Sequence, residues 1–241
     1  MRTLALILGR AGSKGGPGKN SRPIAGRPCI HWTLDDVLEA RRSGVIDRAV
    51  LSSDSTELQK SALEAGLDVV ARPPELATDD ASIDDAARHA VRSLGEPLPD
   101  AVVILYANVP VRPRGLIARA VNLLRASGAD SAQSYSPVGK HHPWWTAVVD
   151  PDSGAVKPWQ GSVLNHGVFR RQDLPPAHVP DGGVLAVTRR ALFLEIAGVA
   201  SGPHAFFGAD RRGIINPEGA VVDIDSETDL LVAEAILAGR D

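Results

Sequence analysis

The stretch LALILGRAGSKGGPGKN, residues 4–20, joins a short apolar run to a loop rich in glycine and positive charge. Residues 4–8 are continuously apolar, which is typical of a strand that is buried on both faces. Gly9 follows the run directly, and ligands of open α/β sheets bind beyond the carboxyl ends of strands. This stretch therefore predicts an α/β fold whose first strand leads into an anion-binding loop.

Apolar runs alternate with amphipathic segments through the first half of the chain, which is typical of βαβ units and a mostly parallel sheet. After the first strand we predict strands at 48–52, 69–71, 101–106, 183–187 and 221–224. The predicted helices are 32–42, 56–65, 82–94, 115–127 and 227–237, with Ser82 as an N-cap. These elements favour a Rossmann-like three-layer αβα sandwich with a mostly parallel central sheet.

Residues 137–180 lack a clean period and are dense in proline, histidine and tryptophan. We interpret them as an insertion into a domain made of residues 1–136 and 181–241. Two interpretations stay open for Trp144, Trp145 and Trp159, which cover either a second subunit, giving a homodimer, or this chain's own core. The histidines of the region show no metal-ligand spacing and are expected at the surface or an interface: His141, His142, His166 and His178.

The composition is that of an ordinary globular chain: 241 residues, 44% hydrophobic, 23% charged, with a formal net charge of −3. Bulk charge therefore indicates neither a nucleic-acid nor a membrane partner, and no stretch reaches the ~18 apolar residues of a membrane span. The single cysteine, Cys29, is expected to be a small buried side chain and not a nucleophile. It fits a reducing compartment, so we expect a cytoplasmic protein.

The N-terminal loop carries three cations among its glycines, Arg10, Lys14 and Lys19. Glycines let backbone N–H groups approach an anion closely, and a triphosphate needs such donors together with cations. The loop is not a P-loop, because Ser13 and Asn20 stand where that motif requires glycine and Ser or Thr. Nor is it a dinucleotide loop, because Ser21 replaces the third glycine. A nucleotidyltransferase loop remains, against the simpler alternative of a flexible turn.

The run RAGSKGGPGKN, residues 10–20, followed by PIAGRP at 23–28, resembles the acylneuraminate cytidylyltransferases, or CMP-sialic acid synthetases. Further matches occur in the same order along the chain: LSSD at 51–54, RPPELATDDAS at 72–82 and VDID at 222–225. The resemblance implies a fold of the nucleotide-diphospho-sugar transferase type. It also implies transfer of CMP from CTP to a nonulosonic (sialic-type) acid, with release of pyrophosphate.

The pair Asp223-x-Asp225 follows an apolar run. In a strand, residues two apart share a face, so the two carboxylates would converge on one spot. Mg²⁺ takes one or two carboxylates together with substrate phosphates and water. By spacing alone, a charge cluster preceding the next helix, with Asp225 as its N-cap, is as good an explanation. The resemblance favours the metal, because the metal carboxylates of the family occupy this motif.

The resemblance also implies which residues form the site. Attack of a sugar hydroxyl on the α-phosphate relies on positioning and charge neutralisation, without a covalent enzyme nucleophile. We assign the catalytic role to Arg10, Lys19, Asp223 and Asp225. The nucleotide would be bound by Arg10, Gly12, Ser13, Lys14, Lys19, Asn20, Arg72, Ala81 and Ser82.

The sugar side departs from the family. Relatives carry Gln-Pro-Thr-Ser-Pro-Leu-Arg where this chain has YANVPVR at 106–112, and Arg-Pro-Asn-Gly where it has VPDG at 179–182. Loss of that arginine removes a group suited to a bidentate grip on a carboxylate, for which Arg170 or Arg171 would compensate. The expected sugar-binding residues are Asn108, Arg112, Arg170, Arg171 and Asp181. Residues 1–136 and 181–241 would form the nucleotidyltransferase domain, and the insertion 137–180 would serve both in dimerisation and as a lid on the sugar site. Another triphosphate such as GTP, another sugar, and a catalytically silent nucleotide-binding relative remain as alternatives.

Overall fold

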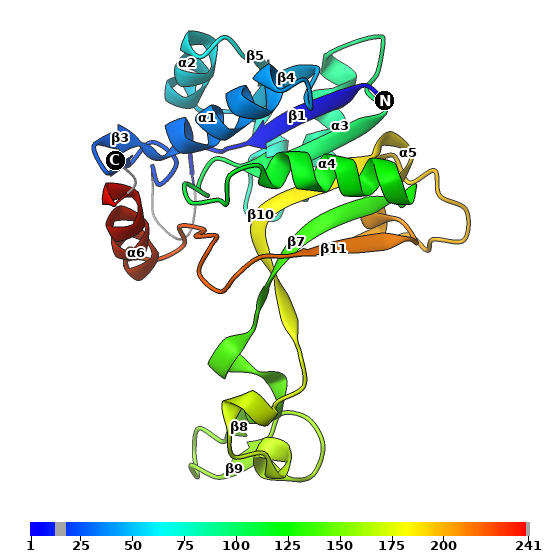
Figure 1. The fold of residues 1–241 in the computed structure, drawn as a ribbon. Coiled ribbons are helices and arrows are strands. Elements are labelled where there is room, and N and C mark those ends of the chain that lie inside the picture. Colours follow the sequence, from blue (N-terminus) through cyan, green and yellow to red (C-terminus); the bar gives the residue numbers. More distant parts are fainter. Residues whose placement is uncertain (13–17, 240–241) are drawn as a thin grey trace.

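A central sheet of seven strands organises the computed structural model, which describes residues 1–12 and 18–239 (Figure 1). The strand order is β11-β7-β10-β6-β1-β4-β5. β10 is antiparallel to both of its neighbours, and the other pairs are parallel. In chain order the strands are β1 (Thr3–Leu8), β4 (Arg48–Ser53), β5 (Asp68–Ala71), β6 (Ala101–Tyr106), β7 (Ser131–Pro137), β10 (His178–Thr188) and β11 (Arg211–Ile215).

Helices cover both faces of the sheet, which confirms the predicted three-layer αβα sandwich. One apolar cluster packs α1 (Cys29–Arg42), α2 (Thr56–Glu64) and α4 (Leu116–Ser127) against the sheet. A second cluster packs α3 (Ile83–Ser93) and the short α5 (Arg189–Leu192) against the opposite face. The successive residues of β1 alternate between the two clusters, because neighbouring side chains of a strand point to opposite faces. This double burial explains the continuous apolar run at residues 4–8.

The C-terminal helix α6 (Glu227–Ala238) closes a third apolar cluster against the segment around β2 (Pro23–Ile24) and β3 (Arg27–Pro28). Cys29 belongs to this cluster and is fully buried, as expected, and burial raises the pKa of its thiol to about 12. Within the part of the chain that the structure describes, no helix is long and apolar enough to cross a bilayer.

The structure corrects three expectations about secondary structure. Residues 221–224 form no strand and make only an isolated bridge between Val222 and Val111. Strands β7 and β11 were missed, because SAQSYSP and RRGII lack the apolar run of a buried strand. The strand predicted at 183–187 is the inner half of the longer β10. β7 pairs with β10, and β11 pairs with β7. These pairings stabilise the two polar strands β7 and β11, whose own side chains do not indicate a place in the sheet.

Residues 138–177 lie between the outer ends of β7 and β10 and form an arm that projects from the body (Figure 1). The arm holds the hairpin of β8 (Ala147–Val149) and β9 (Val156–Pro158) and four short 3-10 turns: η2 (Gly139–His141), η3 (Pro143–Trp145), η4 (Leu164–Gly167) and η5 (Arg171–Asp173). Trp144 stacks on His166 at 4.7 Å, and the indole of Trp145 donates to the Val168 carbonyl at 3.0 Å. Trp159, by contrast, is 67% exposed. The arm therefore covers two of its three tryptophans itself.

Candidate functional site

A cavity of about 340 Å³ lies where the carboxyl ends of β1 and β6 meet the segment that follows β5. Three stretches far apart in the sequence form it: the loop after β1, residues 72–86, and residues 106–108. Its lining combines cations, amides and apolar side chains: Leu8, Gly9, Arg10, Lys19, Asn20, Arg72, Leu76, Thr78, Asp79, Ala81, Ser82, Ile83, Ala86, Tyr106 and Asn108. Most of the residues assigned from sequence to the nucleotide are therefore brought together here.

The described part of the N-terminal loop is held tightly where it leaves β1. A Cβ on Gly9 would lie 3.0 Å from Ala107 Cβ and 3.1 Å from Leu58 Cδ1, so only glycine fits comfortably there. The buried Asn20 donates from Nδ2 to the Arg10 carbonyl at 2.8 Å and thus joins the two ends of the loop. Asn20 therefore shapes the loop. Gly12 is exposed and does not line the cavity, and Ser13 and Lys14 lie outside the described residues.

Both described cations of the loop are paired with carboxylates. Lys19 Nζ lies 2.7 Å from Asp225 Oδ1, and the Arg10 guanidinium donates to the Asp79 carboxylate. Arg10 Nη1 also donates to the Ala77 carbonyl at 3.4 Å. The pairs connect the loop with two other parts of the site. Lys19 reaches the expected metal carboxylates, and Arg10 reaches the segment before α3.

The opposite wall of the cavity comes from the segment between β5 and α3. Arg72 is 8% exposed and donates from Nη2 to the Ser52 carbonyl at 2.8 Å, and burial lowers its pKa. Ser82 is the N-cap of α3, as predicted, and its hydroxyl accepts from the Asp85 N–H at 3.1 Å. Because the Ser82 hydroxyl caps the helix, a ligand in the cavity would meet the backbone of Ser82 at the start of α3. Ala81 precedes it in the lining.

The two expected metal carboxylates lie just before α6. Burial, and secondly the charge of Asp225, raise the pKa of the Asp223 carboxyl to about 6. Asn108 Nδ2 donates to Asp223 and the Asn108 carbonyl accepts from the Ile224 N–H at 2.9 Å, so the end of β6 positions the pair. The side chain of Asp225 is 71% exposed. Two neighbouring carboxylates, one of them largely desolvated, are a donor set that fits Mg²⁺.

The prediction that Asp225 is the N-cap of the following helix is wrong. Ser226 caps α6, and it forms a reciprocal capping box with Asp229. Asp229 Oδ2 also accepts from the Asp225 N–H at 3.1 Å. The side chain of Asp225 is therefore not used by the helix and points instead to Lys19.

The structure does not support the expected sugar contact of Arg112. Its side chain is fully buried and donates to the Gly183 carbonyl at 2.7 Å and to Thr33 Oγ1 at 2.9 Å, with Asp36 at 3.4 Å. A guanidinium in this position braces the turn after β6 and is not in the cavity lining.

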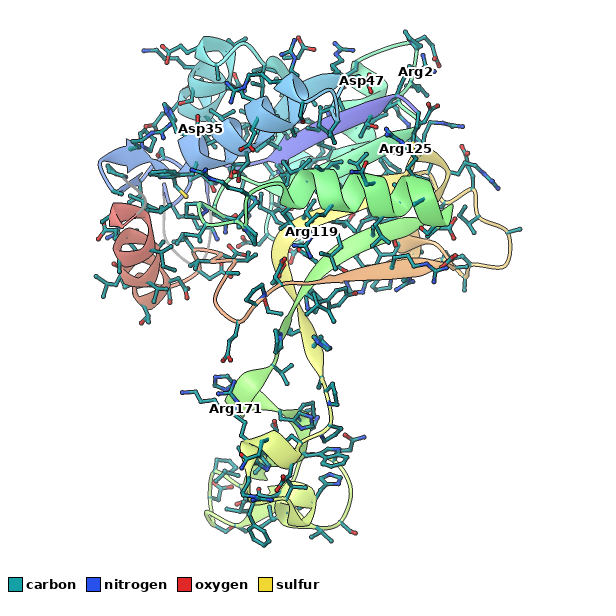
Figure 2. The ribbon with its side chains drawn as sticks, in the orientation of Figure 1. Arg2, Asp35, Asp47, Arg119, Arg125 and Arg171 are labelled. Atoms are coloured by element: carbon teal, nitrogen blue, oxygen red, sulfur yellow. The ribbon has the colours of Figure 1, made fainter. Side chains whose placement is uncertain are left out.

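Asp181, Arg170 and Arg171 also have partners within the chain. Asp181 accepts from Asn216 Nδ2 at 2.8 Å and from the hydroxyls of Ser134 and Ser136, so it joins β7, β10 and the segment after β11. Arg170 pairs with Asp173 at 2.8 Å within the arm. Arg171 lies in the arm and pairs with Glu218 at 2.5 Å (Figure 2). Of the five expected sugar-binding residues, Asn108 alone lines the cavity among the residues described.

Tyr106 and Asp79 are two of the lining residues that the sequence analysis did not assign to the site. Tyr106 ends β6 on the α3 side, and burial, then the charge of Asp223, raise the pKa of its phenol to about 12. Its position at the end of a buried strand was the available signal. Asp79 belongs to the quoted stretch 72–82 but was not singled out, because nothing in the sequence indicates that it reaches Arg10 across the cavity.

No group of three or more His, Cys, Asp or Glu side chains able to hold a metal occurs in residues 1–12 and 18–239. The arm histidines expected at the surface or an interface differ in burial: His142 is 4% exposed and binds the Pro175 carbonyl through Nε2 at 3.1 Å.

Comparison with known proteins identifies the family. The model of a cytidylyltransferase family matches residues 4–153. The chain belongs to this cytidylyltransferase family. The match covers β1, the N-terminal loop and the wall of the cavity.

Two relatives extend this similarity over nearly the whole chain. The CMP-N,N'-diacetyllegionaminic acid synthase of Legionella pneumophila is 34% identical over 245 residues, which cover 98% of this chain and 97% of that protein. An N-acylneuraminate cytidylyltransferase of Streptococcus agalactiae is 31% identical over 233 residues, 96% of this chain and 52% of that protein. The family member described here thus spans about half the length of the streptococcal relative.

A solved structure has the same fold. It is CMP:2-keto-3-deoxy-manno-octonic acid synthetase complexed with CTP, which superimposes with a TM-score of 0.70 at 16% identity, covering 100% of both chains. At 16% identity this similarity shows the fold alone. The proposed activity of this chain depends on the residues of its own cavity.

Proposed function

We propose that this chain transfers CMP from CTP to a nonulosonic (sialic-type) acid, with release of pyrophosphate. One observation supports it above all: a single cavity brings Arg10 and Lys19 together with a wall suited to a base, and the ion pair of Lys19 with Asp225 connects this cavity to the Asp223–Asp225 pair. Family membership and the names of the relatives support the choice of nucleotide and acceptor class.

In the proposed reaction, a hydroxyl oxygen of the acceptor forms a bond to the α-phosphorus of CTP. The bond from that phosphorus to the α–β bridging oxygen breaks, pyrophosphate leaves with the electron pair, and the hydroxyl proton is released. Lys19 and Arg10 would neutralise the triphosphate, and Arg72 with Ala81 and Ser82 would bound the base. Such catalysis consists of positioning and electrostatic stabilisation.

Mg²⁺ is part of the proposal, because the donor set of Asp223 and Asp225 fits it. When bound, the ion would neutralise charge on the phosphate oxygens. Asn108 would hold Asp223 in place through the contact that it already makes. Gly182 leaves room beside the carboxylate, since a Cβ there would lie 3.4 Å from Asp223 Oδ2.

We further propose that the chain works as a homodimer in the cytoplasm. The arm supports the dimer, because apolar side chains gather on it without cover from the body: Val149, Trp159, Val163 and Phe169 are 58–89% exposed. The buried reduced cysteine is consistent with the compartment.

The test of activity is a pyrophosphate-release assay that crosses CTP, GTP, UTP and ATP with nonulosonic acids and aldose derivatives. We expect Mg²⁺-dependent turnover with CTP and a nonulosonic acid. Turnover with GTP or an aldose would indicate a related transferase. Binding of CTP without any turnover would indicate a silent relative and contradict the proposal.

Lys19→Ala should reduce kcat/KM at least about 100-fold, because a cation that neutralises the transferring phosphate contributes several kcal/mol to the transition state. Asp225→Ala should have a similar effect. Lys60→Ala is the matched control, since Lys60 is exposed on α2 and pairs with Glu64 at 3.8 Å away from the cavity. Near-normal rates in Lys19→Ala, with unchanged thermal unfolding, would remove Lys19 from the site.

A further inference from the structure

The charges that line the cavity are unevenly distributed. Among the described lining residues, three are cations, Arg10, Lys19 and Arg72, and Asp79 is the one acid. The Asp79 carboxylate accepts from Nη2 of Arg10, and the two side chains are 31% and 28% exposed. A polyphosphate bound by Arg10 would bring further negative charge next to Asp79, where partial burial weakens screening by water.

The two ion pairs of the site differ in what their carboxylates are available to do. Asp225, the partner of Lys19, stands beside Asp223 and is placed to hold a metal ion. Asp79 lies across the cavity, on the segment between η1 (Pro74–Leu76) and α3. There it faces the guanidinium of Arg10, which already contacts this segment and which would also bind a triphosphate. Nη1 of Arg10 donates to the Ala77 carbonyl of the same segment, at 3.4 Å, so Arg10 spans the cavity wall to wall.

We propose that Asp79 is the resident counter-ion of Arg10 and competes with the phosphates of the substrate and of pyrophosphate for its guanidinium. This inference rests on the proposed function, because it takes the ligand to be a polyphosphate. In the free chain, Asp79 holds Arg10 toward the segment 77–79. On binding, the guanidinium exchanges one carboxylate for phosphate oxygens and leaves Asp79 beside a like charge. Asp79 therefore lowers the affinity for polyphosphates and favours release of pyrophosphate after transfer.

The experiment compares the binding of Mg²⁺-pyrophosphate, CTP and cytidine to the full chain by isothermal titration calorimetry. Asp79→Asn keeps an oxygen that accepts from Arg10 but removes the charge. We expect this variant to bind pyrophosphate and CTP about two- to fivefold more tightly, the range for a partly exposed charge pair. Cytidine lacks phosphates and should bind with unchanged affinity. Asp79→Glu retains the charge and should bind as the wild type does.

Asp35→Asn is the matched control for net charge. Asp35 forms an ion pair with Arg27 at 2.8 Å, and it lies on α1, away from the cavity lining (Figure 2). A gain in pyrophosphate affinity equal to that of Asp79→Asn would assign the effect to overall charge and overturn the proposal. Thermal unfolding of each variant checks that the fold is retained.

A double-mutant cycle with Arg10→Ala locates the effect. If Asp79 acts through Arg10, most of the gain from Asp79→Asn disappears when Arg10 is absent. A gain that persists in full overturns the proposal, as does unchanged or weaker pyrophosphate binding by Asp79→Asn. If the wild-type chain binds pyrophosphate but does not transfer CMP, the proposed function is contradicted. The pyrophosphate affinities of the wild type and Asp79→Asn then still decide the present inference. Wild-type chain that binds no polyphosphate overturns both.

Discussion

At the scale of single residues, the candidate site is built from charges that have partners before any ligand arrives. Lys19 is paired with Asp225 and Arg10 with Asp79, while Asp223 is held by Asn108. Asp223 carries an electrostatic cost, because burial and the neighbouring Asp225 both disfavour its charged form. Such an unfavourable charge is expected at a position where the side chain serves binding and not the stability of the fold.

Asp223→Asn should therefore stabilise the chain while it abolishes transfer. The pKa of Asp223, raised to about 6 in the folded chain, gives a stabilising contribution that is complete below the unfolded pKa of 3.8 and is lost as the pH rises through 6. At pH 7–8 without metal, the variant should gain about 1–3 kcal/mol in unfolding free energy. Near pH 3.5 most of the gain should disappear, because Asp223 is then protonated in the folded chain and largely protonated in the unfolded chain.

Urea denaturation in EDTA at both pH values measures this difference. A variant less stable than the wild type at pH 7–8 would contradict the account of Asp223. Asp35→Asn again serves as the control, because its side chain is 53% exposed.

At the scale of elements, the start of α6 fixes the backbone that carries Asp225. The Ser226 hydroxyl accepts from the Asp229 N–H at 3.3 Å, and Asp229 returns the contact to the N–H groups of Ser226 and Asp225. This capping box holds the chain at the point where it passes from the carboxylate pair into the helix. In β10, Gly183 allows the strand to pack closely against its neighbours, because a Cβ there would lie 2.9 Å from a side-chain atom of Leu116 and from one of Ser134.

Ser226→Ala should lower the unfolding free energy by about 1 kcal/mol, the usual cost of losing an N-cap hydroxyl. It should also weaken the response of the assay to Mg²⁺, because Asp225 loses its fixed backbone. Ser93→Ala removes an exposed hydroxyl at the end of α3 and should change neither quantity. Unaltered stability in Ser226→Ala by urea denaturation would show that the capping box does not hold α6.

At the scale of the whole molecule, the body and the arm have different surfaces. The body buries its apolar side chains in three clusters, whereas the arm leaves Trp159 and Phe169 exposed, by 67% and 89%. Figure 1 shows the arm standing away from the sheet. The ion pair between Arg171 and Glu218 attaches the arm to the segment that leads to Asp223.

Phe169→Asp should convert the proposed dimer to a monomer, because it places a charge in an apolar contact. Leu63→Asp is the control, since Leu63 is 61% exposed on α2 of the body. Sedimentation velocity at micromolar concentration measures the mass of each variant. A wild-type monomer, or a dimer that survives Phe169→Asp unchanged, would contradict the proposed role of the arm.

Local sequence determined the parts of this protein that depend on near neighbours. The apolar run at residues 4–8 indicated a doubly buried strand, and Ser82 indicated the start of α3. The cations and glycines of the loop indicated an anion site, and five of the seven sheet strands were found from their own side chains. These features could be predicted because burial on both faces, capping and charge density are properties of a few consecutive residues.

Tertiary structure alone decided the rest. Strands β7 and β11 are polar, so their place in the sheet depends on pairing partners distant in sequence. Arg112 has a side chain suited to binding an anionic ligand, but it is buried under the turn that it braces. Asp79 meets Arg10 only because the end of β1 and the segment after β5 lie at the same edge of the sheet. The sequence by itself therefore determined the fold class and the position of the cationic, glycine-rich loop after the first strand. Which charges face one another across the cavity was decided by packing, because that geometry exists only once the sheet has formed.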